Sequence, residues 1–241
     1  MAQKTISRES LSEQVYRHLR QALMEGEYRP GERLTIAGVA ELYGTSITPV
    51  REAIMRLASE QALRVVAATS VAVPVLTPGD LREIVAIRHN LEGMAARRVG
   101  EIATPEMVAE FEALNARFMA AATTAPRDAA QLNREFHFLI LRRAGLSYVE
   151  TICENMWTLM GPFLRTFHEE MPAQRLGASD HQHHRFIDAL RANDAEAAQQ
   201  AMQTDIIWAN ELVARIEADR IEAGRIEAGR AEAGRAESEQ T

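Results

Sequence analysis

Residues 36–59 read IAGVAELYGTSITPVREAIMRLAS, and their apolar residues recur at helical spacing on both sides of a single glycine. Gly44 suits the end of a first helix over 36–43. Ser46 can cap a second helix, and Pro49 lies in its first turn, where the missing N–H costs little. Two short helices joined by so tight a turn have the spacing of a helix-turn-helix.

The sequence on either side extends this unit to residues 1–75. Apolar spacing predicts a helix from Ser10 to Met24, and β-branched residues on both sides of 67–70 predict two short strands. Three helices followed by a small hairpin are typical of a winged helix-turn-helix domain. Residues 76–80 are rich in turn-forming residues and are expected to be a linker, with Asp80 capping the helix that follows.

The start of the second helix holds the residues that would face DNA. In a helix-turn-helix this helix enters the major groove with its N-terminal residues nearest the base edges. The hydroxyls of Thr45, Ser46 and Thr48 can bond phosphates or bases, and Arg51 can reach a phosphate or pair with guanine. On spacing alone, a small bundle with an ordinary cap and a surface arginine is an open alternative.

Charge is unevenly distributed along the chain. The total of 27 Lys+Arg against 34 Asp+Glu, net −7, argues against nucleic-acid binding through bulk positive charge. Residues 1–75, however, have a net charge of +1, residues 76–215 of −5 and residues 216–241 of −3. A DNA-binding role would therefore depend on a few well-placed contacts.

Composition narrows the class of protein. A hydrophobic fraction of 46% excludes wholesale disorder, and 5% aromatic residues make a β-sandwich or barrel improbable. No apolar run has the length of a membrane helix, so no membrane association is expected. The single cysteine, Cys153, fits a reducing, cytoplasmic location.

The rest of the chain is predicted to be helical. Residues 81–215 contain no alternating strand pattern and form an all-α bundle of six or seven helices. The predicted helices are 81–99, 105–122, 127–143, 148–168, 180–192 and 194–216. Residues 216–241 carry a five-residue RIEAG-type repeat that keeps no constant helical face, and we expect a frayed or disordered tail.

Four polar residues stand out in this helical part. Asn133 and His137 are one turn apart and share a helix face directed at the bundle interior. With His183 and Asp205 they would supply nitrogen and oxygen ligands for a divalent metal. A histidine-rich loop with buried hydrogen-bonding pairs is the alternative that the residues alone leave open.

The N-terminal part resembles the DNA-binding domain of GntR-type bacterial transcription regulators. The resemblance covers nearly all of residues 8–76 and is most specific in TPVREA, residues 48–53. It implies DNA binding by a homodimer on a palindromic operator. Ile47 and the Ile36-Ala37 pair stand where this family usually has charged residues, and the wing tip lacks basic residues, so operator binding should depend weakly on salt.

The C-terminal part resembles the FCD ligand-binding domain of the FadR-like branch. The similarity rests on Asp80-Leu81 through Arg88 and Glu92, on Asn133 to Leu139, and on the segment from His183 to Asp194. It implies an all-helical domain that holds a small organic acid over a divalent metal. The implied metal ligands are Asn133, His137, His183 and Asp205, although the family usually has Asp at the first position and His at the last.

These deviations change the expected metal. With fewer imidazoles, manganese and iron become plausible beside zinc and nickel. Arg88 matches an arginine that could hold the carboxylate of the effector, or it could pair with Glu92 on a solvated helix face.

The resulting hypothesis is a ligand-responsive transcription regulator, more often a repressor by family habit, with a small carboxylate effector. One alternative is a metal or pH sensor without organic effector that uses His181, His183 and His184. A metal-dependent enzyme is a further alternative, but no general base or nucleophile lies near the predicted ligands in sequence.

Overall fold

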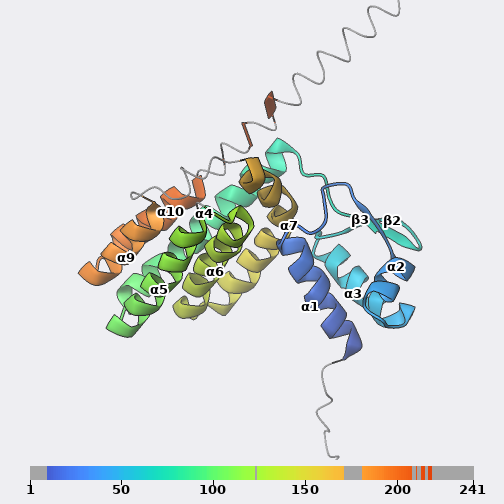
Figure 1. Cartoon of the computed structure of the whole chain (residues 1–241), viewed down its shortest axis with the longest axis horizontal. Helices are drawn as coiled ribbons and strands as arrows, with labels where there is room; N and C mark the ends of the chain where they lie inside the picture. Colours follow the sequence, from blue (N-terminus) through green and yellow to red (C-terminus); the bar gives the residue numbers. More distant parts are fainter. Residues whose placement is uncertain are drawn as a thin grey trace, which may run out of the picture.

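The computed structural model describes residues 10–122, 124–170 and 181–207, together with 210, 213, 214, 217 and 218. Figure 1 shows a small N-terminal unit beside a bundle of longer helices, with helix α1 lying against helix α7 of the bundle. The repeat predicted to form a tail lies outside the described residues.

The N-terminal unit contains three helices: α1 (Leu11–Met24), α2 (Ile36–Leu42) and α3 (Ile47–Ser59). Ser10 caps α1, because its hydroxyl accepts from the backbone N–H of Glu13 at 3.2 Å. Ser46 occupies the N-cap position of α3 but makes no side-chain capping bond, so that part of the prediction was wrong. The apolar faces of the three helices enclose one core, which includes Leu19, Ile54 and Leu57.

The predicted two-stranded hairpin is present, and a third strand extends it to a three-stranded antiparallel sheet. Its strands are β1 (Arg33–Thr35), β2 (Arg64–Ala67) and β3 (Ser70–Ala72), in the order β1-β3-β2. The additional strand, β1, pairs Leu34 with Val71 and buries the Leu34 side chain. A three-residue strand is too short to give a recognisable alternating pattern, which explains why it was missed.

The second unit begins with α4 (Pro78–Glu101), three residues before the predicted start. The N-cap is Thr77 and not Asp80, whose carboxylate instead accepts from the Thr77 backbone N–H at 2.7 Å. Thr77 Oγ1 in turn accepts from the Asp80 N–H, which completes a capping box. Proline is tolerated at the first helical position, so Pro78 starts this helix where a turn was expected.

Five further helices complete the bundle within the described residues. They are α5 (Pro105–Ala122), α6 (Pro126–Ala144), α7 (Ser147–Glu170), α9 (Gln182–Ala192) and α10 (Ala195–Ile207). Phe111, Phe136 and Phe186 meet edge-to-face at its centre. Burial raises the pKa of the Cys153 thiol to about 12, so this core cysteine is an unreactive thiol. No helix in this part of the chain is long and apolar enough to cross a membrane.

The two units share a packed contact. Met24, at the end of α1, and Leu76, before α4, are buried in the core of the C-terminal bundle. Arg20 of α1 donates to Glu154 of α7 at 2.8 Å and to Asn155 at 2.6 Å. The orientation of α1 is therefore set by direct contacts with the bundle as well as by the linker.

Candidate DNA-binding surface and metal centre

The predicted DNA-contacting residues lie together at the exposed start of α3. Ser46, Thr48 and Arg51 are exposed and Thr45 is half-buried. Because the Ser46 side chain makes no capping bond, its hydroxyl is not occupied by the helix it precedes. Ile47 is 50% exposed in the same row, where it offers an apolar contact in place of a charge.

Arg51 connects the recognition helix to the wing. Its Nη1 donates to the carbonyl of Ala68, in the turn between β2 and β3, at 3.3 Å. The guanidinium is thereby placed between the two elements that a winged helix presents to DNA. Five N–H donors leave it able to contact a phosphate or a guanine while this bond persists.

A chain of buried charged groups runs through the C-terminal bundle. Arg88 Nε donates to Glu92 Oε1 at 2.6 Å, and these side chains are 4% and 1% exposed. Glu92 Oε2 lies 2.6 Å from His137 Nδ1, and His137 Nε2 lies 3.1 Å from Asp205 Oδ2. The imidazole of α6 is therefore held between a carboxylate of α4 and one of α10.

The protonation states follow from this pairing. Burial opposes ionisation of Glu92, but Arg88 and His137 outweigh it and lower the pKa of this carboxyl to about 2. Burial likewise opposes the charged form of His137, yet Glu92 and Asp205 raise its pKa above the usual value. The pKa of Asp205 is lowered in spite of burial, chiefly because His137 bonds its carboxylate.

His183 lies beside this chain with one ring nitrogen unused. Its Nδ1 donates a hydrogen bond to Asn115 Oδ1 at 3.3 Å, so the proton is on Nδ1 and the lone pair is on Nε2. That Nε2 is buried and has no hydrogen-bond partner among the described groups. The ring stacks on Phe136 at 3.8 Å, and burial holds its pKa well below the usual value. His183 thus presents a neutral, oriented nitrogen donor.

These donors fit a divalent metal. Ligand atoms of His137, His183 and Asp205 all lie within 4.8 Å of one another. Two ligands on one tetrahedral zinc are separated by roughly 3.3 Å, close to the 3.1 Å between His137 and Asp205. Glu92 and Asn115 bond the opposite nitrogens of the two imidazoles, as outer carboxylates and carbonyls do in metal sites.

The structure brings three of the four predicted ligands together and places the fourth nearby. Asn133 is buried one turn before His137 on the same face of α6. His181 also approaches, with its Nε2 3.8 Å from Asp205 Oδ1. The histidine run 181–184 is therefore divided, since His183 faces the cluster while the ring of His184 bonds Asn115.

Arg88 is paired with Glu92 as one alternative predicted, but the pair is buried and not on a solvated face. Its guanidinium also lies over the Trp157 ring at 3.8 Å. Trp157 Nε1 donates to Glu92 Oε1 at 3.1 Å, so this residue is more than core packing. A role for Arg88 in holding an effector carboxylate stays a prediction, and the ligand would compete with Glu92.

Sequence reasoning missed the parts played by Glu92, Asn115 and Trp157. The signal for Asn115 was present, because it interrupts the buried face of α5 formed by Phe111, Phe118 and Ala122. A lone polar residue in such a row must find a partner. The sequence gives no comparable signal that Glu92 is buried, since an acidic residue four positions after an arginine is common on solvated helices.

The fold defines a winged helix-turn-helix protein joined to an all-helical C-terminal domain. Residues 11–73 match the bacterial regulatory proteins of the gntR family, and residues 83–206 match the FCD domain. The chain is 34% identical over 194 residues to the HTH-type transcriptional regulator McbR of Escherichia coli (strain K12). That alignment covers 80% of this chain and 88% of McbR.

Two further comparisons also match the chain to HTH-type transcription regulators. A solved structure of E. coli McbR/YncC superposes with a TM-score of 0.80 at 32% identity, covering 86% of this chain and 99% of that one. The HTH-type transcriptional repressor GlaR of Escherichia coli (strain K12) is 24% identical over 199 residues, 80% of this chain and 90% of GlaR. The chain belongs to the GntR family, in the branch with an FCD domain, and is a DNA-binding transcription regulator and not an enzyme.

Proposed function

We propose that the chain is a homodimeric repressor whose operator binding is controlled by a small organic acid bound with a divalent metal in the C-terminal domain. The observation that carries the sensing part is the buried Nε2 of His183, which lacks a partner beside His137 and Asp205. Repression is supported by relatives such as GlaR, whose name describes a repressor.

The donor set limits the metal. Two imidazoles, one carboxylate and the amide of Asn133 would hold it, which suits zinc, nickel, manganese or iron. When bound, the metal would supply a Lewis acid that could bind the carboxylate of the acid. This chain's own residues orient the site: Glu92 fixes the ring of His137, and Asn115 fixes that of His183.

Metal content tests the first half of the proposal. We expect about one equivalent of a transition metal in untagged protein purified without chelator, measured by plasma mass spectrometry. His183→Gln should weaken metal binding by more than the roughly 100-fold typical of an outer-shell change. His18→Gln is the matched control, because His18 is exposed on α1 and its ring lies beside Tyr43 in the N-terminal unit. Less than a tenth of an equivalent of metal per chain in the wild-type protein would contradict the proposed metal site.

The effector is tested separately by thermal-shift screening of small carboxylic acids with and without metal. If an acid binds over the metal, it should raise the unfolding temperature only in metal-loaded protein, since a ligand of the folded state stabilises it by mass action. A response to metal alone would instead indicate the alternative, a metal-sensing regulator without organic effector.

The DNA side of the proposal is a two-fold complex on a palindromic operator. A homodimer matches the symmetry of such a site, with one recognition helix in each half. Thr45, Ser46, Thr48 and Arg51 would make the contacts. Effector binding would shift the population of DNA-competent arrangements through the contact between α1 and the bundle.

Operator binding is expected to depend weakly on salt. The plot of log affinity against log salt should be shallower than about −8, since basic residues are few at the recognition helix and wing. Arg51→Ala should either reduce that slope by about 1 or relax specificity at one base pair, and fluorescence anisotropy can distinguish these results. Arg56→Ala, on the same helix but paired with Glu13 at 2.7 Å, should leave both quantities unchanged. A steeper slope would show that phosphate contacts outside this surface dominate.

A further inference from the structure

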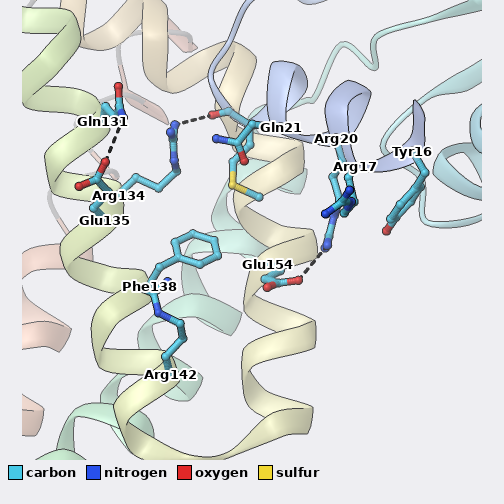
Figure 2. Close-up of a pocket in the computed structure, with 11 residues that line it drawn as sticks. Tyr16, Arg17, Arg20, Gln21, Gln131, Arg134, Glu135, Phe138, Arg142 and Glu154 are labelled. Carbon is cyan, nitrogen blue, oxygen red and sulfur yellow. Dashed lines mark hydrogen bonds and ion pairs between the residues drawn. The ribbon is translucent and has the colours of Figure 1, made fainter. Parts of the chain in front are cut away.

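A cavity lies between the DNA-binding unit and the bundle, away from the buried histidines. Its volume is about 370 Å³, and its walls come from α1, α6 and α7. Figure 2 shows Phe138 and Arg142 in the space between α6 and α7, and Arg134 reaching toward the end of α1. Both structural units therefore contribute to one hollow.

The lining carries an excess of positive charge. Four arginines face two glutamates, Glu135 and Glu154; the arginines are Arg17, Arg20, Arg134 and Arg142. In a chain with a net charge of −7, a hollow lined by more arginines than glutamates attracts anions.

Not all of this positive charge is used by the protein. Arg20 and Arg134 connect the two units, Arg20 to Glu154 and Arg134 to Glu25 at 3.1 Å. Arg142, by contrast, has no ion pair or side-chain hydrogen bond within the described part of the chain, and it is exposed. The Nε of Arg20 is buried without an acceptor, so this guanidinium also has an unused donor.

The remaining wall is apolar. Phe138 is half-buried and approaches Trp157 at 5.9 Å, and Met24 adds its side chain at the end of α1. An anion with an aromatic or aliphatic group would therefore find partners for both of its parts. A guanidinium binds carboxylate and phosphate in the same bidentate way, so the shared chemistry is a small oxyanion.

We propose that this cavity binds a small organic anion, a carboxylate or phosphate ester with an apolar group, that connects α1 to α6 and α7. Such a ligand would neutralise the excess charge and fix the DNA-binding unit relative to the bundle. The site is separate from the His137 cluster, although α6 contributes residues to both. Anion binding in this cavity is therefore expected to need no metal.

The test uses full-length protein treated with chelator, and calorimetry with phenyl phosphate as the probe. We expect binding that Arg142→Ala weakens at least tenfold, while Arg143→Ala leaves it within twofold. Arg143 is the matched control because it is exposed on the same helix and pairs with Glu110, outside the cavity. Equal binding by the two variants would overturn the proposal.

Two comparisons establish the nature of the ligand and the place where it binds. Phenol should bind at least tenfold more weakly than phenyl phosphate, and inorganic phosphate should also bind more weakly, because each lacks one half of the complementary chemistry. Inorganic phosphate binding as tightly as the ester would refute the organic ligand.

His183→Gln should leave phenyl phosphate binding unchanged, and a loss in that variant would place the anion at the histidine cluster instead. Slower hydrogen exchange in α1 with phenyl phosphate is the expected sign of connection between the units.

Discussion

Arg88→Ala is expected to lower the free energy of unfolding by about 3–5 kcal/mol, the usual cost of removing one partner from a buried ion pair. Arg88 and Glu92 are both almost inaccessible, and the Nε–Oε1 distance is 2.6 Å. Among the described residues, the variant leaves a buried carboxylate with His137 and Trp157 as its partners. Urea unfolding followed by circular dichroism measures the change.

Arg98→Ala on the same helix is the matched control. Arg98 pairs with Glu101 at 3.3 Å, but both side chains are exposed, so the loss should be at most about 1 kcal/mol. If Arg88→Ala costs no more than this control, the buried pair contributes nothing beyond a surface pair. Metal affinity should also fall by about 10- to 100-fold in Arg88→Ala, because Glu92 orients the ring of His137.

Most of the helices could be predicted from periodicity and capping residues. The helix-turn-helix and the bundle were recognisable because apolar residues recur every three to four positions over long segments. Depth of burial was not available from the same pattern. Arg88 and Glu92 have the spacing of a solvated i,i+4 pair, and only contacts with α6 and α7 show that they are enclosed.

The candidate metal cluster was partly predictable, because helical periodicity shows which residues share a face. The spacing of Asn133 and His137 placed both on one face of a helix, and both are buried as expected. The partners of that face lie far along the chain: Glu92 is 45 positions before His137, and Asp205 is 68 positions after it. Periodicity within one helix carries no information on such pairings, so Asn115 and Glu92 were identified only from the structure.

The contact between the two units was the least predictable feature, and it leads to the second large effect. Gly161→Ala in α7 is expected to displace α1. A Cβ at this position would lie 2.2 Å from the carbonyl oxygen of Leu23 and 2.6 Å from that of Met24. Both obstacles are backbone atoms at the end of α1, so side-chain rotation cannot relieve the overlap.

The displacement should be costly because the contact is tightly packed. Met24 would lose its burial in the bundle core, and Arg134 would lose its 3.3 Å bond to the Met24 carbonyl. Overpacking of this kind typically costs about 1–3 kcal/mol, more than the roughly 0.5–1 kcal/mol that alanine gains over glycine within a helix. Hydrogen exchange in α1 should become markedly faster, and thermal unfolding should begin earlier.

Gly79→Ala separates this effect from the general effect of replacing a helical glycine. Gly79 lies in the first turn of α4, where an added Cβ meets only Thr77 Oγ1 at 3.5 Å, an ordinary contact. This control should keep or slightly raise stability and leave exchange in α1 unchanged.

If the contact also transmits the effector signal, Gly161→Ala should bind operator equally with and without effector, since the bundle no longer determines the position of α1. Normal regulation in Gly161→Ala, with exchange in α1 as slow as in Gly79→Ala, would show that this contact neither constrains α1 nor couples the two units.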